Sequence, residues 1–100
     1  MQGEEESWPK SVGEAAERVL QLMSEEDRAR LRRTARGDLI QFHFTLGLFI
    51  RNNFGLYAGN DALLRSSGCF EADGCSSAII ERAWEKLQAT APPIAGRDRP

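Results

Sequence analysis

Apolar residues recur along most of this chain at intervals of three and four positions, which is the spacing of one face of an α-helix. The clearest stripe follows Trp8-Pro9-Lys10 and consists of Val12, Ala15, Ala16, Val19, Leu20 and Met23. Ser11 precedes this stripe and Glu14 comes three residues later, the arrangement of a capping box that satisfies two backbone N–H groups. The pattern therefore predicts a first helix that begins after Ser11 and buries one face.

The segment over about residues 39–53 is apolar around most of its circumference. On a helical wheel, one broad side holds Leu39, Phe42, His43, Leu46, Gly47, Phe49 and Ile50, and the next quadrant holds Ile40, Phe44, Leu48 and Arg51. A helix with so little polar surface is normally buried among other helices. Gly47 in its middle is expected to permit a close approach between helices. The sequence therefore predicts a central helix that is enclosed on several sides.

Three further helices complete the predicted architecture and span about residues 25–35, 61–66 and 73–89. Their predicted N-terminal caps are Ser24, Asn60 and either Asp73 or Ser76. Gly55 suits the left-handed position that ends the central helix. Because no period-two alternation predicts strands, we expect an all-α fold: a single compact domain of about five short helices packed around a central apolar helix.

The length of 100 residues fits one domain. Residues 1–6 are polar and acidic, and residues 91–100 include three prolines, so we expect a helical domain over residues 7–90 between a flexible N-terminus and a flexible C-terminal tail. No apolar run approaches the roughly 20 residues of a membrane helix. The acidic start does not resemble a secretory signal. We therefore expect a cytoplasmic protein that does not contact the membrane.

Few residues in the chain could hold a metal ion. Cys69, Cys75 and the single histidine, His43, are fewer than the roughly four ligands of a zinc site. A disulfide between the cysteines stays open as an alternative, but two reduced thiols are the preferred interpretation for a cytosolic chain. The sequence carries no phosphate-binding loop, HExxH or GxSxG pattern. We expect no metal and no cofactor, and an enzyme is the less favoured class.

Positive charge is concentrated in one segment, although the net charge of the chain is −2. Five arginines fall within nine residues: Arg28, Arg30, Arg32, Arg33 and Arg36. Because phosphate binding needs a basic surface, the negative net charge argues against nucleic acid as the main partner. A solvated helix face is the preferred interpretation. The alternative is a surface for nucleic acid or another anion on Arg28, Arg32, Arg33 and Arg36.

A longer motif runs from the central segment into the loop after it. It reads Phe42-His43-Phe44-Thr45-Leu46-Gly47-Leu48-Phe49-Ile50-Arg51-Asn52-Asn53-Phe54-Gly55-Leu56-Tyr57-Ala58-Gly59-Asn60, and Asp73, Ser76, Ile79-Ile80 and Trp84 follow downstream. With Trp8-Pro9 ahead of it, the stretch resembles a family of small bacterial proteins catalogued as a domain of unknown function, with the pattern FHxxLGxxIRNxxGLxxGN followed by DxxS, II and W. The resemblance covers about residues 7–88 and implies a compact, non-secreted domain. It transfers no catalytic residue.

Polar side chains gather near the end of the central segment and in the loop that follows. The candidate binding residues are His43, Arg51, Asn52, Asn53, Tyr57 and Asn60. An unpaired charge among apolar neighbours would be costly, so Arg51 needs partners, for which the candidates are Asp38, Asp61 and Asp73. Structural roles are the preferred interpretation: a core histidine, a helix-end arginine that ties loops together, and turn-forming or capping residues. No residue is assigned a catalytic role.

Two functions follow from these patterns. The first hypothesis is a non-enzymatic module that presents a helical surface to a protein partner, a second copy of the chain included. Tyr57 and Arg51 are of the residue types that anchor interfaces. The alternative is a small anion- or ligand-binding protein, an enzyme included, with its site around Arg51 and the loop of residues 55–60, where glycines and a helix N-terminus would favour an anion.

Overall fold

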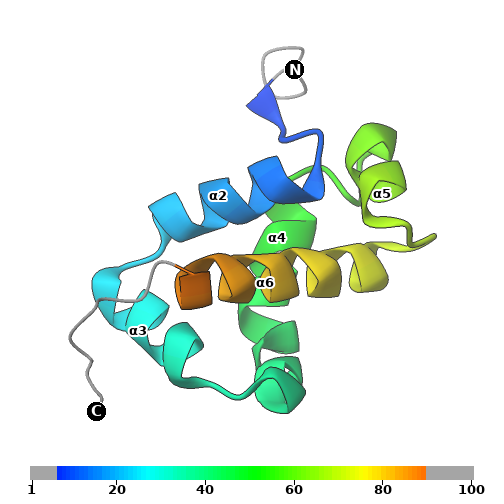
Figure 1. Ribbon diagram of the computed structural model, residues 1–100. Helices are drawn as coiled ribbons and strands as arrows, with labels where there is room; N and C mark the ends of the chain where they lie inside the picture. The colour runs from blue at the N-terminus through cyan, green and yellow to red at the C-terminus, as the bar shows by residue number, and fades with distance from the viewer. Residues whose placement is uncertain (1–6, 90–100) are drawn as a thin grey trace.

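The computed structural model describes residues 7–89, and every regular element in this range is helical (Figure 1). In chain order, the elements are α2 (Val12–Leu22), α3 (Glu25–Arg33), the 3-10 helix η1 (Arg36–Phe42), the π-helix η2 (His43–Gly47), α4 (Leu48–Asn53), α5 (Asp61–Ser67) and α6 (Ala72–Ala89). The predicted all-α, single-domain fold is confirmed. The ends predicted to be flexible, residues 1–6 and 91–100, lie outside the described residues. Within residues 7–89, no helix has the length and apolar character needed to span a bilayer.

The centre of the fold is α6, the longest helix. It lies against α2, α3, α4, α5, η1 and η2 (Figure 1). Its buried residues are Cys75, Ser76, Ile79, Ile80, Ala83 and Leu87. The expected cap is wrong, because α6 begins at Ala72 and both Asp73 and Ser76 lie inside its first two turns.

The helix predicted over residues 39–53 is observed as an unbroken helical segment, but two expectations about it are wrong. Its backbone changes from a 3-10 helix to a π-helix and then to an α-helix, so it is not one regular helix. Only one side is buried, and it holds Phe42, Gly47, Ile50 and Arg51. Of the second apolar quadrant, Ile40, Phe44 and Leu48 face solvent, with Ile40 71% and Phe44 80% exposed, whereas Arg51 is buried. A chain of 100 residues forms one modest core, which covers only one side of this segment. The helix at the centre of the fold is α6 instead.

Gly47 leaves room mainly for the Arg51 side chain of its own segment, whereas the sequence predicts a close approach to another helix. A Cβ atom at this position would lie 3.0 Å from Nη1 of Arg51 and 3.7 Å from Cδ1 of Ile80. Phe42 and Gly47 are five residues apart, the spacing at which a π-helix repeats its hydrogen bonds. Both residues are buried, and Gly47 is the one in contact with α6, through Ile80.

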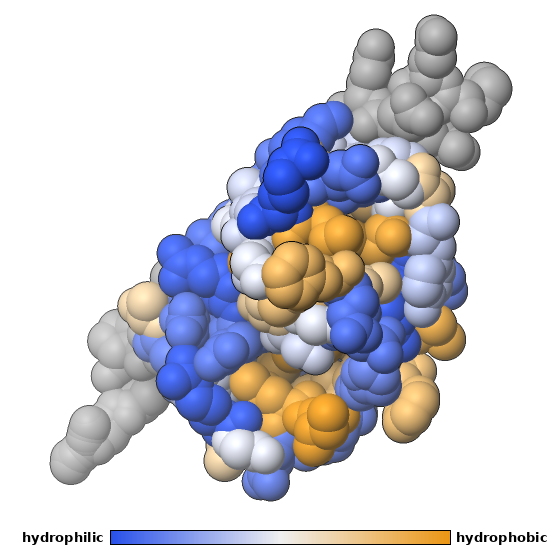
Figure 2. Space-filling model, turned by 90° about the vertical axis from the view of Figure 1, so that its right-hand side faces the viewer, coloured by the Kyte–Doolittle hydropathy of each residue, from blue (hydrophilic) through white to orange (hydrophobic). Residues whose placement is uncertain are grey.

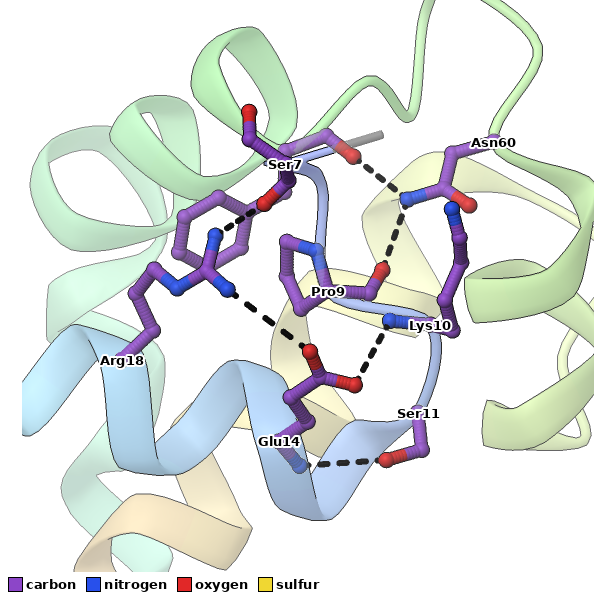
Figure 3. A network of polar contacts seen from close by, with 8 residues as sticks. Ser7, Pro9, Lys10, Ser11, Glu14, Arg18 and Asn60 are labelled. Atoms are coloured by element: carbon purple, nitrogen blue, oxygen red, sulfur yellow. Dashed lines mark hydrogen bonds and ion pairs between the residues drawn. The ribbon is translucent and has the colours of Figure 1, made fainter. Parts of the chain in front are cut away.

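Side-chain caps fix the starts of three helices. Ser11 accepts the Glu14 N–H at 3.1 Å, Ser24 accepts the Asp27 N–H at 3.1 Å, and Asn60 accepts the Leu63 N–H at 3.3 Å. These caps were predicted and are confirmed. The second bond of the predicted capping box differs, because the Glu14 carboxylate accepts the N–H of Lys10, at 3.1 Å, one residue before the cap (Figure 3).

The segment before α2 is tied to the loop after α4 by the side chain of Asn60. Its amide nitrogen donates to the carbonyl oxygens of Pro9, at 2.9 Å, and Phe54, at 2.8 Å (Figure 3). On the other side of the segment, Arg18 of α2 donates to the carbonyl oxygen of Ser7 (Figure 3). These bonds hold Trp8 and Pro9 between α2 and the loop that leads to α5.

Gly55 provides the space that Trp8 occupies. Its φ of 77° is in the left-handed region, as predicted for the end of the preceding helix. A Cβ atom on Gly55 would lie 2.5 Å from two carbon atoms of the Trp8 ring. Glycine is therefore required here both by the backbone angle and by the indole.

Candidate functional site

The buried Arg51 guanidinium, placed near the C-terminus of α4, is at the centre of a polar cluster. The side chain is 4% exposed. Nε donates to the Tyr57 hydroxyl at 3.0 Å and lies 3.5 Å from a carboxylate oxygen of Asp73. Nη1 donates to Oγ of Ser76 at 3.0 Å, and Nη2 donates to the carbonyl oxygen of His43 at 3.4 Å. Four segments, η2, α4, the loop before α5 and α6, therefore meet at one cation.

Each contact in this cluster has a structural consequence. The Ser76 hydroxyl donates its own proton to the carbonyl oxygen of Asp73, at 3.0 Å, so its oxygen is oriented to accept from Arg51. Asp73 supplies the opposite charge, while Asp38 and Asp61, the other expected partners, form no ion pair with Arg51 in the described part of the chain. A buried cation with a carboxylate and three hydrogen-bond acceptors is largely compensated within the fold.

The structure brings together four of the six predicted binding residues. Arg51, Asn52, Asn53 and Tyr57 line one surface hollow of about 340 Å³, whose other walls are Ser7, Trp8, Gly55 and Ala58. The sequence reasoning did not include Trp8 in this site. No sequence signal ties Trp8 to the hollow, because the contact depends on how the first segment folds back over Gly55.

The other two predicted residues lie elsewhere. Asn60 is buried, and its amide is used to cap α5 and to hold Pro9 and Phe54. The His43 imidazole contacts the ring of Phe44 edge to face, with the ring centroids 4.8 Å apart. His43 lines a different hollow, of about 260 Å³, between η1 and α6. It reaches the Arg51 cluster only through its backbone carbonyl.

Of the two cysteines, Cys69 and Cys75, the second offers little reactivity. Both are free thiols, and Cys75 is fully buried. Burial raises the pKa of the Cys75 thiol, which keeps it protonated and therefore poorly nucleophilic at neutral pH. Within residues 7–89, no three His, Cys, Asp or Glu side chains come together in a way that could hold a metal ion.

Two arginines of the basic segment form hydrogen bonds or ion pairs with other residues of the chain. Arg28 donates to the carbonyl oxygens of Leu20 and Met23, at 2.7 Å and 2.6 Å, and so caps the C-terminus of α2. Arg36 pairs with Glu81 at 2.9 Å and Glu85 at 2.6 Å. These contacts neutralise Arg36 and place Arg28 at the negative end of a helix, which reduces the positive potential available to a nucleic acid.

Four apolar residues of the segment from η1 to α4, which were predicted to be buried, lie on the surface. We define the apolar stripe as Ile40, Phe44, Leu48 and Phe49, all of which are exposed. Ile40 lies in η1, Phe44 in η2, and Leu48 and Phe49 at the start of α4. The signal was present in the sequence, because a helix with two apolar quadrants in a chain of 100 residues exceeds the core available.

Two hollows flank the apolar stripe. The hollow between η1 and α6 is lined by Leu39, Ile40, His43 and Ile80, with Arg36 and Glu81 at its edge. The hollow between the stripe and α3, of about 250 Å³, is lined by Met23, Phe42, Leu46 and Phe49, with Asp27 and Arg30 at its edge. Figure 2, viewed from the right-hand side of Figure 1, shows apolar residues gathered in several places between polar ones on that face of the molecule. The surface thus combines protruding apolar side chains with adjacent depressions.

Comparison with known proteins gives one match. The family model described as Domain of unknown function (DUF6794) matches residues 8–87, from Trp8 to the last buried residue of α6, Leu87. No curated protein and no solved structure matches the chain.

Proposed function

This chain belongs to the DUF6794 family, and we propose that it works by binding another protein through the apolar stripe. The observation that carries the proposal is the exposure of Phe44, at 80%, and Ile40, at 71%, within one short helical segment. Scattered apolar residues are ordinary on a protein surface. A contiguous apolar patch rimmed by polar residues is typical of an interaction site.

The aromatic rings of the stripe are held in place before any partner arrives. Phe44 contacts the His43 ring edge to face, and Phe49 contacts the buried ring of Phe54 at a centroid distance of 6.1 Å and an angle of 74°. A side chain that is already ordered loses less conformational entropy on binding. Large apolar and aromatic anchors of this kind supply most of the binding energy in protein interfaces.

The role is proposed as non-enzymatic because the polar groups of the described residues serve the fold. Arg51 is compensated by Asp73 and its hydrogen-bond partners, and the Asn60 amide is used by the N-terminal segment and α5. We further propose a bacterial cytoplasmic setting, which the motif resemblance supports.

Anion or ligand binding near Arg51 is the alternative function. The hollow of about 340 Å³ beside Arg51, Asn52, Asn53 and Tyr57 favours it, because these side chains offer several hydrogen-bond donors. The apolar stripe is the stronger candidate, since the Arg51 charge already has an opposite charge at 3.5 Å.

A photo-crosslinking residue at position 44, expressed in cells of the organism that encodes the protein, tests the proposal. We expect a discrete covalent adduct from position 44. The matched control is position 70, because Phe70 is 96% exposed but lies outside the stripe. Adducts of equal yield at both positions, or no adduct at position 44, would contradict a specific interface on the stripe.

A further inference from the structure

We infer that Cys69 and Cys75 form a reversible disulfide when a hydroperoxide oxidises the protein, which makes the turn between α5 and α6 a redox-sensitive site. This turn is separate from the apolar stripe, so the inference goes beyond the proposed function and does not depend on it. The two cysteines are free thiols in the structure. Where a cell keeps most thiols reduced, a disulfide of this kind is transient and forms in response to an oxidant.

The turn between the two helices brings the cysteines to the same place (Figure 1). Gly68 ends α5 with a φ of 76°, in the left-handed region, and α6 begins at Ala72. The Cys69 side chain lies against the first turn of α6, because a Cβ atom on Gly74 would lie 3.1 Å from both Cβ and Sγ of Cys69. Cys75 is the next residue of that helix, and consecutive Cα atoms are about 3.8 Å apart. Glycine at position 74 therefore leaves the space that the Cys69 side chain occupies beside Cys75.

Both sulfur atoms also lie at the end of α5. Sγ of Cys75 is 3.7 Å from the carbonyl oxygen of Leu63, and Sγ of Cys69 is 3.8 Å from that of Ser67, one helical turn farther along. The Ser67 side chain accepts the Cys69 backbone N–H at 3.1 Å and forms a hydrogen bond with the Cys75 thiol. Burial raises the pKa of the Cys75 thiol, and the charge of a neighbouring Cys69 thiolate raises it further. Side-chain rotation and a shift of the turn would bring the sulfurs to the bond length of about 2.05 Å.

The two thiols differ in exposure, which sets the order of the reaction. Cys69 is partly exposed and precedes Phe70, which is 96% exposed, whereas Cys75 is fully buried. An oxidant in solution therefore reaches Cys69 first. The Cys69 thiolate attacks one oxygen of the hydroperoxide and the O–O bond breaks. Cys69 becomes a sulfenic acid, and the other oxygen leaves and takes up a proton.

Cys75 completes the disulfide. It loses its proton, and its thiolate attacks the Cys69 sulfur, so that the S–S bond forms and the S–O bond breaks. Hydroxide leaves and takes up the proton as water. With hydrogen peroxide, two thiols and one peroxide give one disulfide and two waters. Because only the thiolate attacks and burial raises the pKa of Cys75, this second step should become faster as the pH rises toward that pKa.

Intact mass spectrometry and peptide mapping of the full chain, after treatment with a single equivalent of hydrogen peroxide, test the inference. We expect a loss of two hydrogen atoms, which dithiothreitol reverses. Cleavage after Arg65 and Arg82 releases one peptide that contains both cysteines. A disulfide within the chain leaves this peptide lighter by two hydrogens, whereas a disulfide between chains joins two copies of it. An unchanged mass, a bond only between chains, or oxygen addition to Cys69 without loss of hydrogen would overturn the inference.

Two matched variants test the order of the steps. Cys75→Ala should stop at the Cys69 sulfenic acid, which dimedone traps, because the second thiol is missing. Cys69→Ala should stay unmodified under the same conditions, since its remaining thiol is buried. Circular dichroism establishes that each variant is folded, and the measurement on the wild-type protein does not depend on either. Oxidation of Cys69→Ala as fast as that of the wild type would overturn the role of Cys69 as the residue that meets the oxidant.

Discussion

Arg51 shows how a buried charge becomes a structural element when its partners come from several segments. The guanidinium meets Tyr57, Ser76, Asp73 and the carbonyl oxygen of His43, and its side chain is almost inaccessible to solvent. Removing a partner of Arg51 is costly because the buried cation is then less well compensated, and removing Arg51 leaves the buried Ser76 hydroxyl without its donor. Replacing the cation with an apolar side chain of similar volume is less costly, because no unpaired charge remains.

We expect Arg51→Ala to lower the free energy of unfolding by about 3 kcal/mol, since it opens a cavity and removes the donors from Ser76 and Tyr57. Arg51→Met should cost less than half of that. Arg82→Ala is the matched control, because the Arg82 side chain is 48% exposed and pairs with Glu85 only within one helix. Its effect should stay below about 0.5 kcal/mol. Urea denaturation measures all three, and equal losses for Arg51→Ala and Arg82→Ala would contradict the role of the cluster.

The need for partners at Arg51 could be predicted from the sequence, but their identity could not. An arginine among Phe44, Gly47 and other apolar neighbours must be compensated, and Asp73 was one of three acidic candidates. The choice among them depends on how α6 approaches α4, which local patterns do not encode. The sequence suggested Ser76 as a candidate helix cap, and its bond to Arg51 is a tertiary contact.

At the scale of elements, the segment from η1 to α4 shows why its apolar pattern led to the wrong prediction that it is the central helix of the fold. Apolar residues occupy so much of its circumference that the pattern is compatible with several backbone geometries. The structure uses a π-turn to bring Phe42 and Gly47 to the same side, and an α-helical turn for Ile50 and Arg51. Helix caps, by contrast, depend on residues close in sequence, and the Ser11, Ser24 and Asn60 caps could be predicted.

The joint between the N-terminal segment and the loop after α4 gives a prediction at this scale. Gly55→Ala should destabilise the protein more than Gly68→Ala, although the two glycines have φ angles of 77° and 76°. Alanine is strained at both positions, but only at Gly55 would its Cβ meet the Trp8 ring, whereas nothing lies within 4 Å at Gly68. We expect the difference in the free energy of unfolding to be about 2 kcal/mol, the usual cost of overpacking.

Combining Gly55→Ala with Trp8→Ala isolates the contact. Most of the excess cost should disappear against a Trp8→Ala background, because the clashing ring is then absent, and a thermal or urea double-mutant cycle measures this coupling. Equal effects of Gly55→Ala and Gly68→Ala in the wild-type background would mean that the position of the Trp8 ring does not require glycine at residue 55.

At the scale of the whole molecule, the periodicity of the sequence was sufficient for the all-α class but not for the distribution of apolar residues between core and surface. A chain of 100 residues has one modest core. That core is assembled around α6 from residues such as Val19, Leu31, Ile50 and Leu63. Which apolar residues are buried depends on how all the helices pack together. The exposure of Ile40 and Phe44 therefore cannot be predicted from the pattern of their own segment.

If the apolar stripe serves binding rather than folding, polar replacements there should leave the stability of the monomer almost unchanged. We expect Phe44→Ser to alter the free energy of unfolding by less than about 0.5 kcal/mol, because the ring is mostly in solvent. Phe54→Ser is the matched control, since Phe54 is buried in the core, and it should cost about 3–5 kcal/mol. The measurement is urea denaturation of dilute protein, where self-association does not add to the apparent stability. A loss at Phe44 as large as that at Phe54 would mean that the stripe belongs to the core of the fold, and the proposed interface would then have no basis.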